Sequence, residues 1–216
     1  MFIPFKKKLI TKSTFFLGAY PLETGKKPEP IEWIVLKKEG TKGIAVSKYG
    51  LDARPYNAEE NKETIWETSD IRAWLNNDFY KEAFSAEEKT KLQLYDVVNS
   101  YYLRIGNDSV SIGKTGDSDT RDRVFLLSIV EAAEYIKESE KRQMIASCFA
   151  EDKGAPKNKE TGFSIWWLRS PLKGGNSAAA VMDTGKINTL PYSDIHQNDK
   201  LAVRPAICID LHSGLI

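Results

Sequence analysis

The chain has 216 residues, 41% of them hydrophobic and 28% charged, which is typical of soluble globular proteins and enough for one large domain or two small ones. Lys and Arg number 31 against 30 Asp and Glu, so the net charge of +1 does not favour nucleic acid or a membrane as a partner. The short basic cluster Lys6-Lys7-Lys8 indicates a solvated N-terminal arm, because nucleic-acid binding needs a more extended patch.

No apolar run approaches the roughly 20 residues of a membrane span, and the N-terminal segment lacks the apolar core of a signal peptide. We therefore expect a cytoplasmic or particle-associated chain, with residues 1–14 as an arm and residues 15–216 as one domain. Cys148 and Cys208 show no CxxC spacing, which excludes a zinc site of the common kind. A disulfide between them stays open, although the apolar surroundings of Cys208 favour a small buried hydrophobe.

The first half of the chain predicts strands and then helices. Residues 15–19 and 31–36 have strand character, and the second of these is apolar on both faces, as in a central strand. Residues 38–41 predict a hairpin connection into a strand at residues 43–47. The polar residues 52–63 predict a loop.

Helix signals follow. A helix is expected to begin near Trp66, with Thr68 or Ser69 as its cap and Asn76-Asn77 as a candidate interruption. Two capping boxes start at Ser85 and Ser128, and the second comes directly after a strand at residues 124–127.

The C-terminal part predicts two buried strands. Residues 163–168 are apolar on both faces, and residues 201–211 show the clearest alternation in the chain. Pro205 interrupts the second run and marks a bulge or an unpaired position, because it has no N–H to donate. We interpret the whole as one α+β domain.

Two arginines stand inside these apolar runs. The favoured interpretation is that Arg169 and Arg204 are structural, each paired with a carboxylate and stacked on a tryptophan. The alternative is that one of them points into a ligand groove. Trp166 and Trp167 are adjacent in a strand and point to opposite faces, so at most one can face such a groove.

The ordered set of motifs resembles a known family. The set comprises Leu17-Gly18-Ala19-Tyr20-Pro21, residues 31–36, 66–76, 84–88 and 122–128, Trp166-Trp167-Leu168-Arg169-Ser170-Pro171 and Val203-Arg204-Pro205-Ala206. It resembles a bacterial domain family of unknown function, common in gut Firmicutes, with a fold like those of C-type lectins and formylglycine-generating enzymes. The resemblance implies antiparallel sheets with a few helices, N- and C-terminal strands that pair, and a binding surface built by residues 172–200.

The chain departs from both relatives of that fold. It has neither the Glu-Pro-Asn or Gln-Pro-Asp triplet nor the Trp-Asn-Asp triplet of calcium-dependent lectins. It also lacks the closely spaced cysteine pair of the formylglycine-generating enzymes. We expect no cofactor, with calcium at Asp117, Asp119 and Asp122 as the alternative.

The polar segment 172–200 is the predicted ligand-binding region, because Tyr, Ser, Asn and Asp give adaptable hydrogen bonding. The candidate ligand-binding residues are Trp167, Arg169, Asn176, Asn188, Tyr192, Asp194, His196 and Asn198. An ordinary solvated loop is the plain alternative. Composition also fits a loop diversified by a retroelement, as in some phage and bacterial lectin-like proteins.

The sequence favours a non-enzymatic module that recognises a glycan or a protein surface, with no nucleic-acid or membrane partner. The alternatives are an enzyme related to the formylglycine-generating group and a structural phage or assembly protein. The identity of the ligand and the oligomeric state are not encoded in any motif of the chain.

Overall fold

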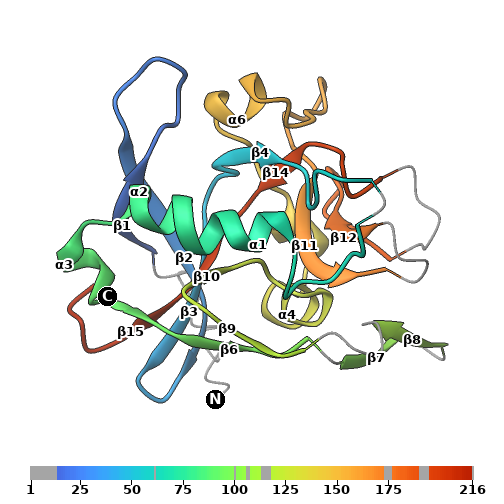
Figure 1. Cartoon of the computed structure of the whole chain (residues 1–216), viewed down its shortest axis with the longest axis horizontal. Coiled ribbons are helices and arrows are strands. Elements are labelled where there is room, and N and C mark those ends of the chain that lie inside the picture. Colours follow the sequence, from blue (N-terminus) through green and yellow to red (C-terminus); the bar gives the residue numbers. More distant parts are fainter. Residues whose placement is uncertain are drawn as a thin grey trace, which may run out of the picture.

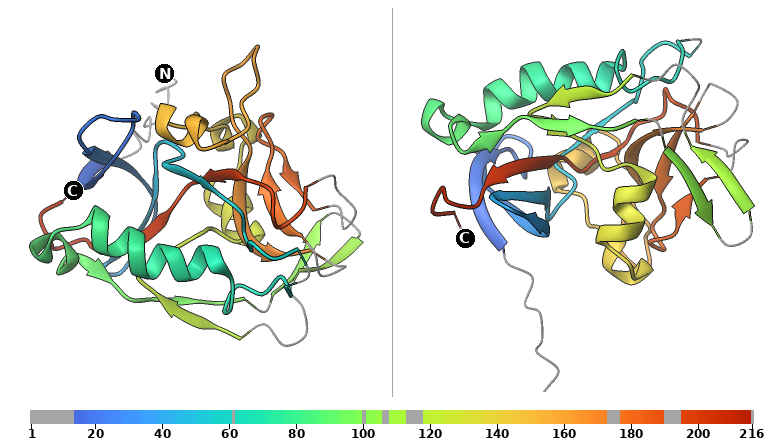
Figure 2. Two further views of the ribbon diagram at one scale, coloured as in Figure 1. Left: turned by 45° about the horizontal axis from the view of Figure 1, so that its top comes forward. Right: turned by 90° about the horizontal axis from the view of Figure 1, so that it is seen from below.

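The fold is described from a computed structural model that covers residues 14–60, 62–99, 101–105, 108–112, 118–172, 177–189 and 195–215 (Figure 1). The first sheet has the order β1-β2-β3-β15-β10, with β5 also pairing with β15. Its strands are β1 (Thr14–Tyr20), β2 (Glu29–Glu39), β3 (Lys42–Ser47), β5 (Leu92–Gln93), β10 (Val124–Phe125) and β15 (Ala206–Asp210). All of its pairings are antiparallel, and the sheet curls into half a barrel (Figure 2).

The second sheet has the order β13-β12-β11-β14-β4. Its strands are β4 (Asp52–Arg54), β11 (Trp166–Pro171), β12 (Ala178–Val181), β13 (Ile187–Asn188) and β14 (Leu201–Val203). Only the β11–β14 pair is parallel. Two small ribbons complete the strands, β6 (Tyr95–Val97) with β9 (Thr120–Asp122) and β7 (Tyr101–Ile105) with β8 (Asp108–Ile112).

The helices are short. They are α1 (Asp70–Trp74), the π-helical η1 (Leu75–Phe79), α2 (Tyr80–Ala83), α3 (Ala86–Lys89), α4 (Ile129–Tyr135), α5 (Ser139–Arg142) and α6 (Cys148–Asp152). The first three run on without a break across the front of the molecule (Figure 1). Together with the antiparallel sheets they make an α+β domain, as the sequence predicts. In the described ranges, no helix is long and apolar enough to cross a membrane.

The local signals for helix starts are confirmed. Ser69 caps α1 by accepting the N–H of Arg72, while the π-helical turn that follows contains Asn76 and Asn77. Ser85 and Ser128 each form the predicted capping box, at the start of α3 and α4. These motifs act within one turn of backbone, so a single sequence is enough to identify them.

The predicted order of strands is largely confirmed. β2 is central because it pairs with β1 on one side and β3 on the other, through a turn with Gly40 at φ +56°. Two boundaries differ from the prediction. Residues 52–63 contain the short strand β4, and the strand predicted at residues 124–127 ends at Phe125 because the chain then enters the cap of α4.

The predicted strand at residues 201–211 is divided between the two sheets. β14 pairs with β4 and β11 in the second sheet, whereas β15 pairs with β3, β5 and β10 in the first. Pro205 lies between them, and its carbonyl accepts the N–H of Ser47 at 2.9 Å. The residue that cannot donate to a ladder is therefore the point at which the chain changes sheets.

The predicted pairing of the terminal strands is wrong. β1 and β15 belong to the same sheet, but β2 and β3 lie between them. The physical reason is that β1, β2 and β3 form successive hairpins, so one edge of β1 is taken by β2. The free edge of β3 then receives β15. The pairing was implied by family resemblance and not by any pattern in these residues.

One apolar core connects the sheets. Trp33, Trp66, Trp166 and Trp167 are all fully buried in it. Their indole N–H groups find partners, as buried tryptophans require: Trp33 donates to the carbonyl of Leu17 at 2.8 Å.

Candidate functional site

Arg169 on β11 is a structural residue of the core. Its side chain is 1% exposed and forms an ion pair with Glu131 of α4. Its Nη1 donates to the carbonyl oxygen of Leu126 at 2.8 Å, and its Nε donates to Asn99 Oδ1 at 3.1 Å. The predicted carboxylate partner is thus present.

Arg204 shows the predicted stacking on a tryptophan. Its guanidinium lies over the ring of Trp166, with 5.0 Å between Cζ and the ring centroid. Its Nε donates to the carbonyl of Ser47 at 2.9 Å, while its Nη1 has no partner among the described residues. Burial without a paired carboxylate lowers the pKa of Arg204 to about 10.

The predicted site residues fall into three groups. Trp167 and Arg169 lie in the core, where the indole of Trp167 donates to the carbonyl of Arg54 at 2.9 Å. His196 and Asn198 are exposed, and Asn188 on β13 is partly exposed. Asn176, Tyr192 and Asp194 lie outside the described residues. The structure therefore separates the two buried residues from the surface residues of the loop region.

The described end of the loop region is anchored by Gln197, which the sequence analysis did not select. This side chain is fully buried. Its Oε1 accepts from Asn57 Nδ2 at 2.9 Å and from Thr64 Oγ1 at 2.7 Å. Its Nε2 donates to the carbonyls of Glu60 at 2.7 Å and Lys62 at 2.6 Å. A lone polar residue in a polar loop has no periodic signal, so sequence patterns could not reveal this role.

A further hydrogen bond lies within the loop region and joins two of its described parts. Ser177 Oγ donates to the carbonyl of Ile195 at 2.6 Å. The neighbouring turn is closed by Asp199, whose Oδ2 accepts the N–H of His196 at 2.7 Å. His196 and Asn198 are thus presented from a fixed backbone.

The turn between β12 and β13 is held against α5. Gly185 has φ +79°, and a Cβ on it would lie 1.8 Å from the carbonyl oxygen of Ser139. The carbonyl of Gly185 accepts from Arg142 Nε at 2.8 Å. Only glycine fits at this close approach of two backbones.

The carboxylates considered for calcium have protein partners. Asp122 accepts from Trp66 Nε1 at 2.9 Å and from Arg72 Nε at 2.8 Å. Asp119 accepts the N–H of Asn99 at 2.9 Å, and Asp117 lies outside the described residues. Within the part of the chain that the structure describes, no cluster of His, Cys, Asp or Glu side chains is arranged to hold a metal ion.

The two cysteines are unpaired. Cys148 is exposed at the start of α6, and Cys208 is buried in β15, as its apolar surroundings indicate. Burial raises the pKa of the Cys208 thiol to about 11, so this group is not an activated nucleophile.

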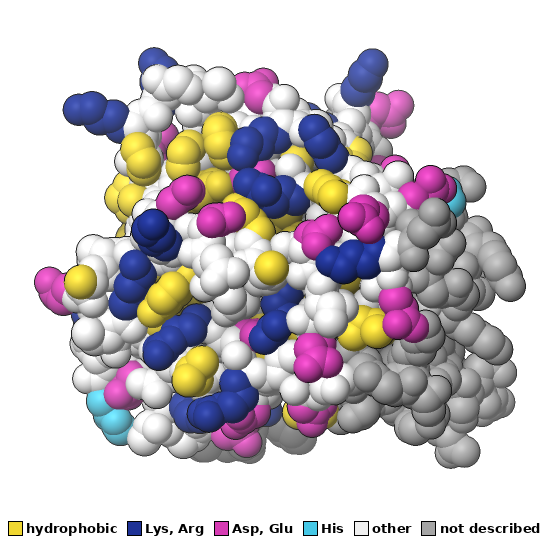
Figure 3. Space-filling model, viewed as in Figure 1, with side chains coloured by type: hydrophobic (Ala, Val, Ile, Leu, Met, Phe, Trp, Pro, Cys, Tyr) yellow, Lys and Arg dark blue, Asp and Glu magenta, His cyan; other side chains and the backbone are white. Residues whose placement is uncertain are grey.

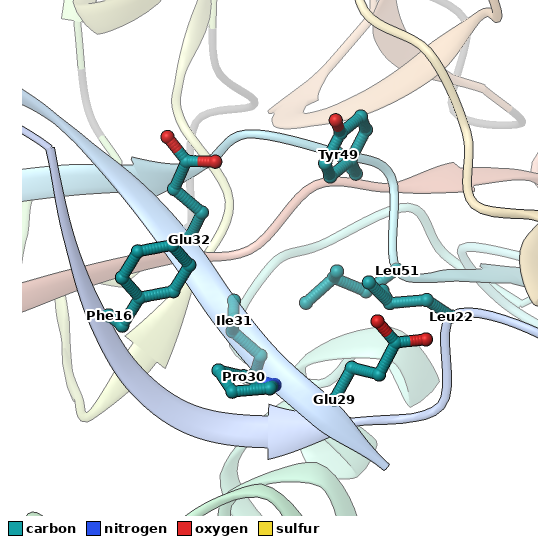
Figure 4. A pocket seen from close by; sticks show the side chains of 8 residues that line it. All are labelled: Phe16, Leu22, Glu29, Pro30, Ile31, Glu32, Tyr49 and Leu51. Atoms are coloured by element: carbon teal, nitrogen blue, oxygen red, sulfur yellow. The ribbon is translucent and has the colours of Figure 1, made fainter. Parts of the chain in front are cut away.

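A groove that the sequence analysis missed lies between the β1–β2 hairpin and residues 49–51 (Figure 4). Its volume is about 470 Å³, within the range of ligand sites in proteins. Leu22, Pro30, Ile31 and Leu51 give it an apolar lining. Two rings and two carboxylates complete it, those of Phe16, Tyr49, Glu29 and Glu32.

Figure 4 shows Phe16 and Glu32 on one side of the groove and Tyr49, Leu51 and Leu22 on the other. Phe16 is 62% exposed, although Phe15 and Leu17 on either side of it are buried. The sequence shows a phenylalanine in a strand but not which face of that strand is buried. The exposure of Phe16 could therefore not be predicted from the sequence. The face drawn in Figure 3 carries Lys, Arg, Asp and Glu side chains interspersed, in line with the small net charge.

Comparison with protein families gives one result. A family model described as "Domain of unknown function (DUF6273)" matches residues 32–211. The chain belongs to this family. The DUF6273 region begins inside β2. It is therefore preceded by β1, the β1–β2 loop and the first residues of β2, which include Phe16, Leu22 and Glu29 of the groove. Comparison of the chain with curated proteins and with solved structures found no match.

Proposed function

We propose that this DUF6273 domain is a non-catalytic ligand-binding module that recognises a glycan or a protein surface through residues 172–200. The observation that supports the proposal is the anchoring of this region to Asn57 and Thr64 by the buried Gln197, together with the hydrogen bond from Ser177 to Ile195 within the region. Rigid presentation of exposed polar side chains, here His196 and Asn198, lowers the entropy lost on binding.

The finer family assignment belongs to the same proposal. We propose that the domain is of bacterial origin and related to C-type-lectin-like folds, which also present their ligand sites on long loops before the last strands. The antiparallel sheets and few helices support this relation, whereas the absence of pairing between β1 and β15 counts against it.

Binding is favoured over catalysis by the distribution of titratable groups. Burial and the neighbouring Asp52 raise the pKa of Tyr20, burial and the neighbouring Glu131 raise that of Tyr95, and burial lowers that of Arg204. These three groups have different neighbours, so in the described part of the chain they do not form one catalytic cluster.

The test is a glycan and surface-protein array probed with the full chain. It is run once with calcium and once with EDTA, so that calcium-dependent binding is distinguished from calcium-independent binding. Any ligand found is then measured against a His196→Ala/Asn198→Ala variant. We expect affinity to fall about tenfold or more, because truncation of central contacts costs about 1–2 kcal/mol each. The thermal unfolding midpoint should stay unchanged, because both side chains are exposed.

Glu160→Ala is the matched control, because Glu160 is exposed on a different loop. Full binding by the double variant would refute the use of the loop region. The absence of any reproducible ligand on the array would count against the binding module itself.

A further inference from the structure

The groove beside β1 and β2 has features that residues 172–200 do not supply. β1 and β2 lie at the opposite end of the molecule from β12 (Figure 1), so this is a separate site. Phe16 and Ile145 are the large hydrophobic side chains that stay exposed among the described residues, and only Phe16 lines the groove. An exposed ring over an apolar groove gains free energy when a ligand covers it.

One wall already accommodates an ammonium group. Lys48 Nζ lies 2.7 Å from Glu32 Oε2 and 5.3 Å from the centroid of the Tyr49 ring. The carboxylate and the ring face supply the two attractions that a cation finds in protein sites. The hydrogen bond to Glu32 raises the pKa of Lys48, so the ammonium form is the one held there.

The second carboxylate has no such partner. Glu29 is exposed and lines the groove, and among the residues that the structure describes no cation lies within ion-pair distance of it. Two carboxylates, those of Glu29 and Glu32, therefore line the groove, and only Glu32 is paired with a lysine among the described residues. Its charge favours a cationic ligand and disfavours an acidic one.

We propose that this groove binds an extended peptide segment in which a lysine is flanked by apolar residues. The lysine ammonium pairs with Glu29, and the apolar neighbours cover Phe16, Leu22 and Pro30. A lysine provides both parts of this complementarity, since its stem packs on apolar surface and its head stays charged.

The test is a titration of the ¹⁵N-labelled full chain, followed by amide chemical shifts. The probes are acetyl-Gly-Leu-Lys-Leu-Gly-amide and the same peptide with Gln in place of Lys. We expect the lysine peptide to shift the amides of residues 16, 22, 29, 31, 32 and 49–51, and to bind several-fold more tightly than the glutamine peptide. Raising the salt concentration should weaken only the lysine peptide, because salt screens exposed charge pairs.

Variants test the apolar contact at Phe16 and the charge pair at Glu29 separately. Phe16→Ser should weaken binding of the lysine peptide about tenfold, and Glu29→Gln about threefold. Ile145→Ser and Glu160→Gln are the matched controls, because both residues are exposed and neither lines the groove. Lys48→Gln should tighten binding about threefold, since it frees Glu32 for the ligand; a purely structural Lys48 would give no gain.

Several outcomes would overturn the proposal. They are equal affinity of the two peptides, an unchanged affinity of the Glu29→Gln variant, and no shift with the lysine peptide at millimolar concentration. The neutral trisaccharide maltotriose is the last arm. Shifts of the groove amides by maltotriose and not by the lysine peptide would assign the site to saccharides instead.

Discussion

At the scale of single residues, the two arginines of the C-terminal strands differ in what they contact. Arg169 has a carboxylate and several carbonyls as partners, whereas Arg204 has one carbonyl and the face of Trp166. Both are charged groups in a core, and a buried charge is costly unless it is paired and hydrogen-bonded. Removal of a partner group is therefore expected to lower the free energy of unfolding more at Arg169 than at Arg204.

We predict that Glu131→Gln lowers the free energy of unfolding by about 3 kcal/mol, because it leaves the buried Arg169 without its counter-charge. Glutamine preserves the capping box of α4, so the loss is assigned to the charge. Urea unfolding measures the change. Glu134→Gln on the same helix is exposed and should change stability by less than about 0.5 kcal/mol, so equal effects of the two variants would refute the argument.

At the scale of elements, the side-chain amide of Gln197 connects the loop region to residues 57–64. It accepts hydrogen bonds from Asn57 and Thr64 and donates to backbone carbonyls that include those of Glu60 and Lys62. No element of regular structure performs this role. These loops are therefore joined by side-chain contacts and by the backbone hydrogen bond from the N–H of Asn57 to the carbonyl of Gln197.

We predict that Gln197→Met leaves the fold intact but speeds amide hydrogen exchange in residues 57–64 about tenfold or more, because Met fills the space without replacing the hydrogen bonds. Hydrogen exchange followed by mass spectrometry measures this effect. Asn198→Ala, one residue away and exposed, is the control. A uniform change over all segments, or none in residues 57–64, would contradict the assignment.

Much of this level could be predicted from the sequence. The capping boxes at Ser85 and Ser128 and the central position of residues 31–36 follow from signals that extend over a few residues. The role of Gln197 and the groove around Phe16 could not be predicted, because each depends on contacts between segments distant in sequence. The sequence predicts Trp167 and Arg169 as site residues because their side chains can bind ligands. In the structure these side chains instead contact Arg54 and Glu131 inside the core.

At the scale of the whole molecule, the two sheets are joined by one continuous segment. β14 belongs to the second sheet and β15 to the first, with Arg204 and Pro205 between them. The guanidinium of Arg204 contacts Ser47 in β3 and Trp166 in β11, one residue from each sheet. The sheets therefore share a core and a cross-connection.

We predict that the two sheets unfold in one transition. In urea unfolding, tryptophan fluorescence and far-UV circular dichroism should give coincident midpoints, because both sheets contain buried tryptophans. Arg204→Met should move both curves together by about 1 kcal/mol, since it removes the hydrogen bond to Ser47. Trp33→Phe removes the tryptophan of the first sheet, so that among the sheet residues the remaining fluorescence comes from Trp166 and Trp167 of the second. Separated midpoints for the two signals would show that the sheets are independent.

The contact at Gly185 limits how the surface of this protein can evolve. A side chain at this position would collide with the carbonyl of Ser139, and an insertion into the turn would push β12 away from α5. Substitutions are therefore restricted at Gly185, whereas the exposed side chains of His196 and Asn198 are free of this constraint. A library that randomises His196 and Asn198 and keeps Gly185 and Gln197 fixed would explore new binding surfaces while retaining the contacts that hold this region in place.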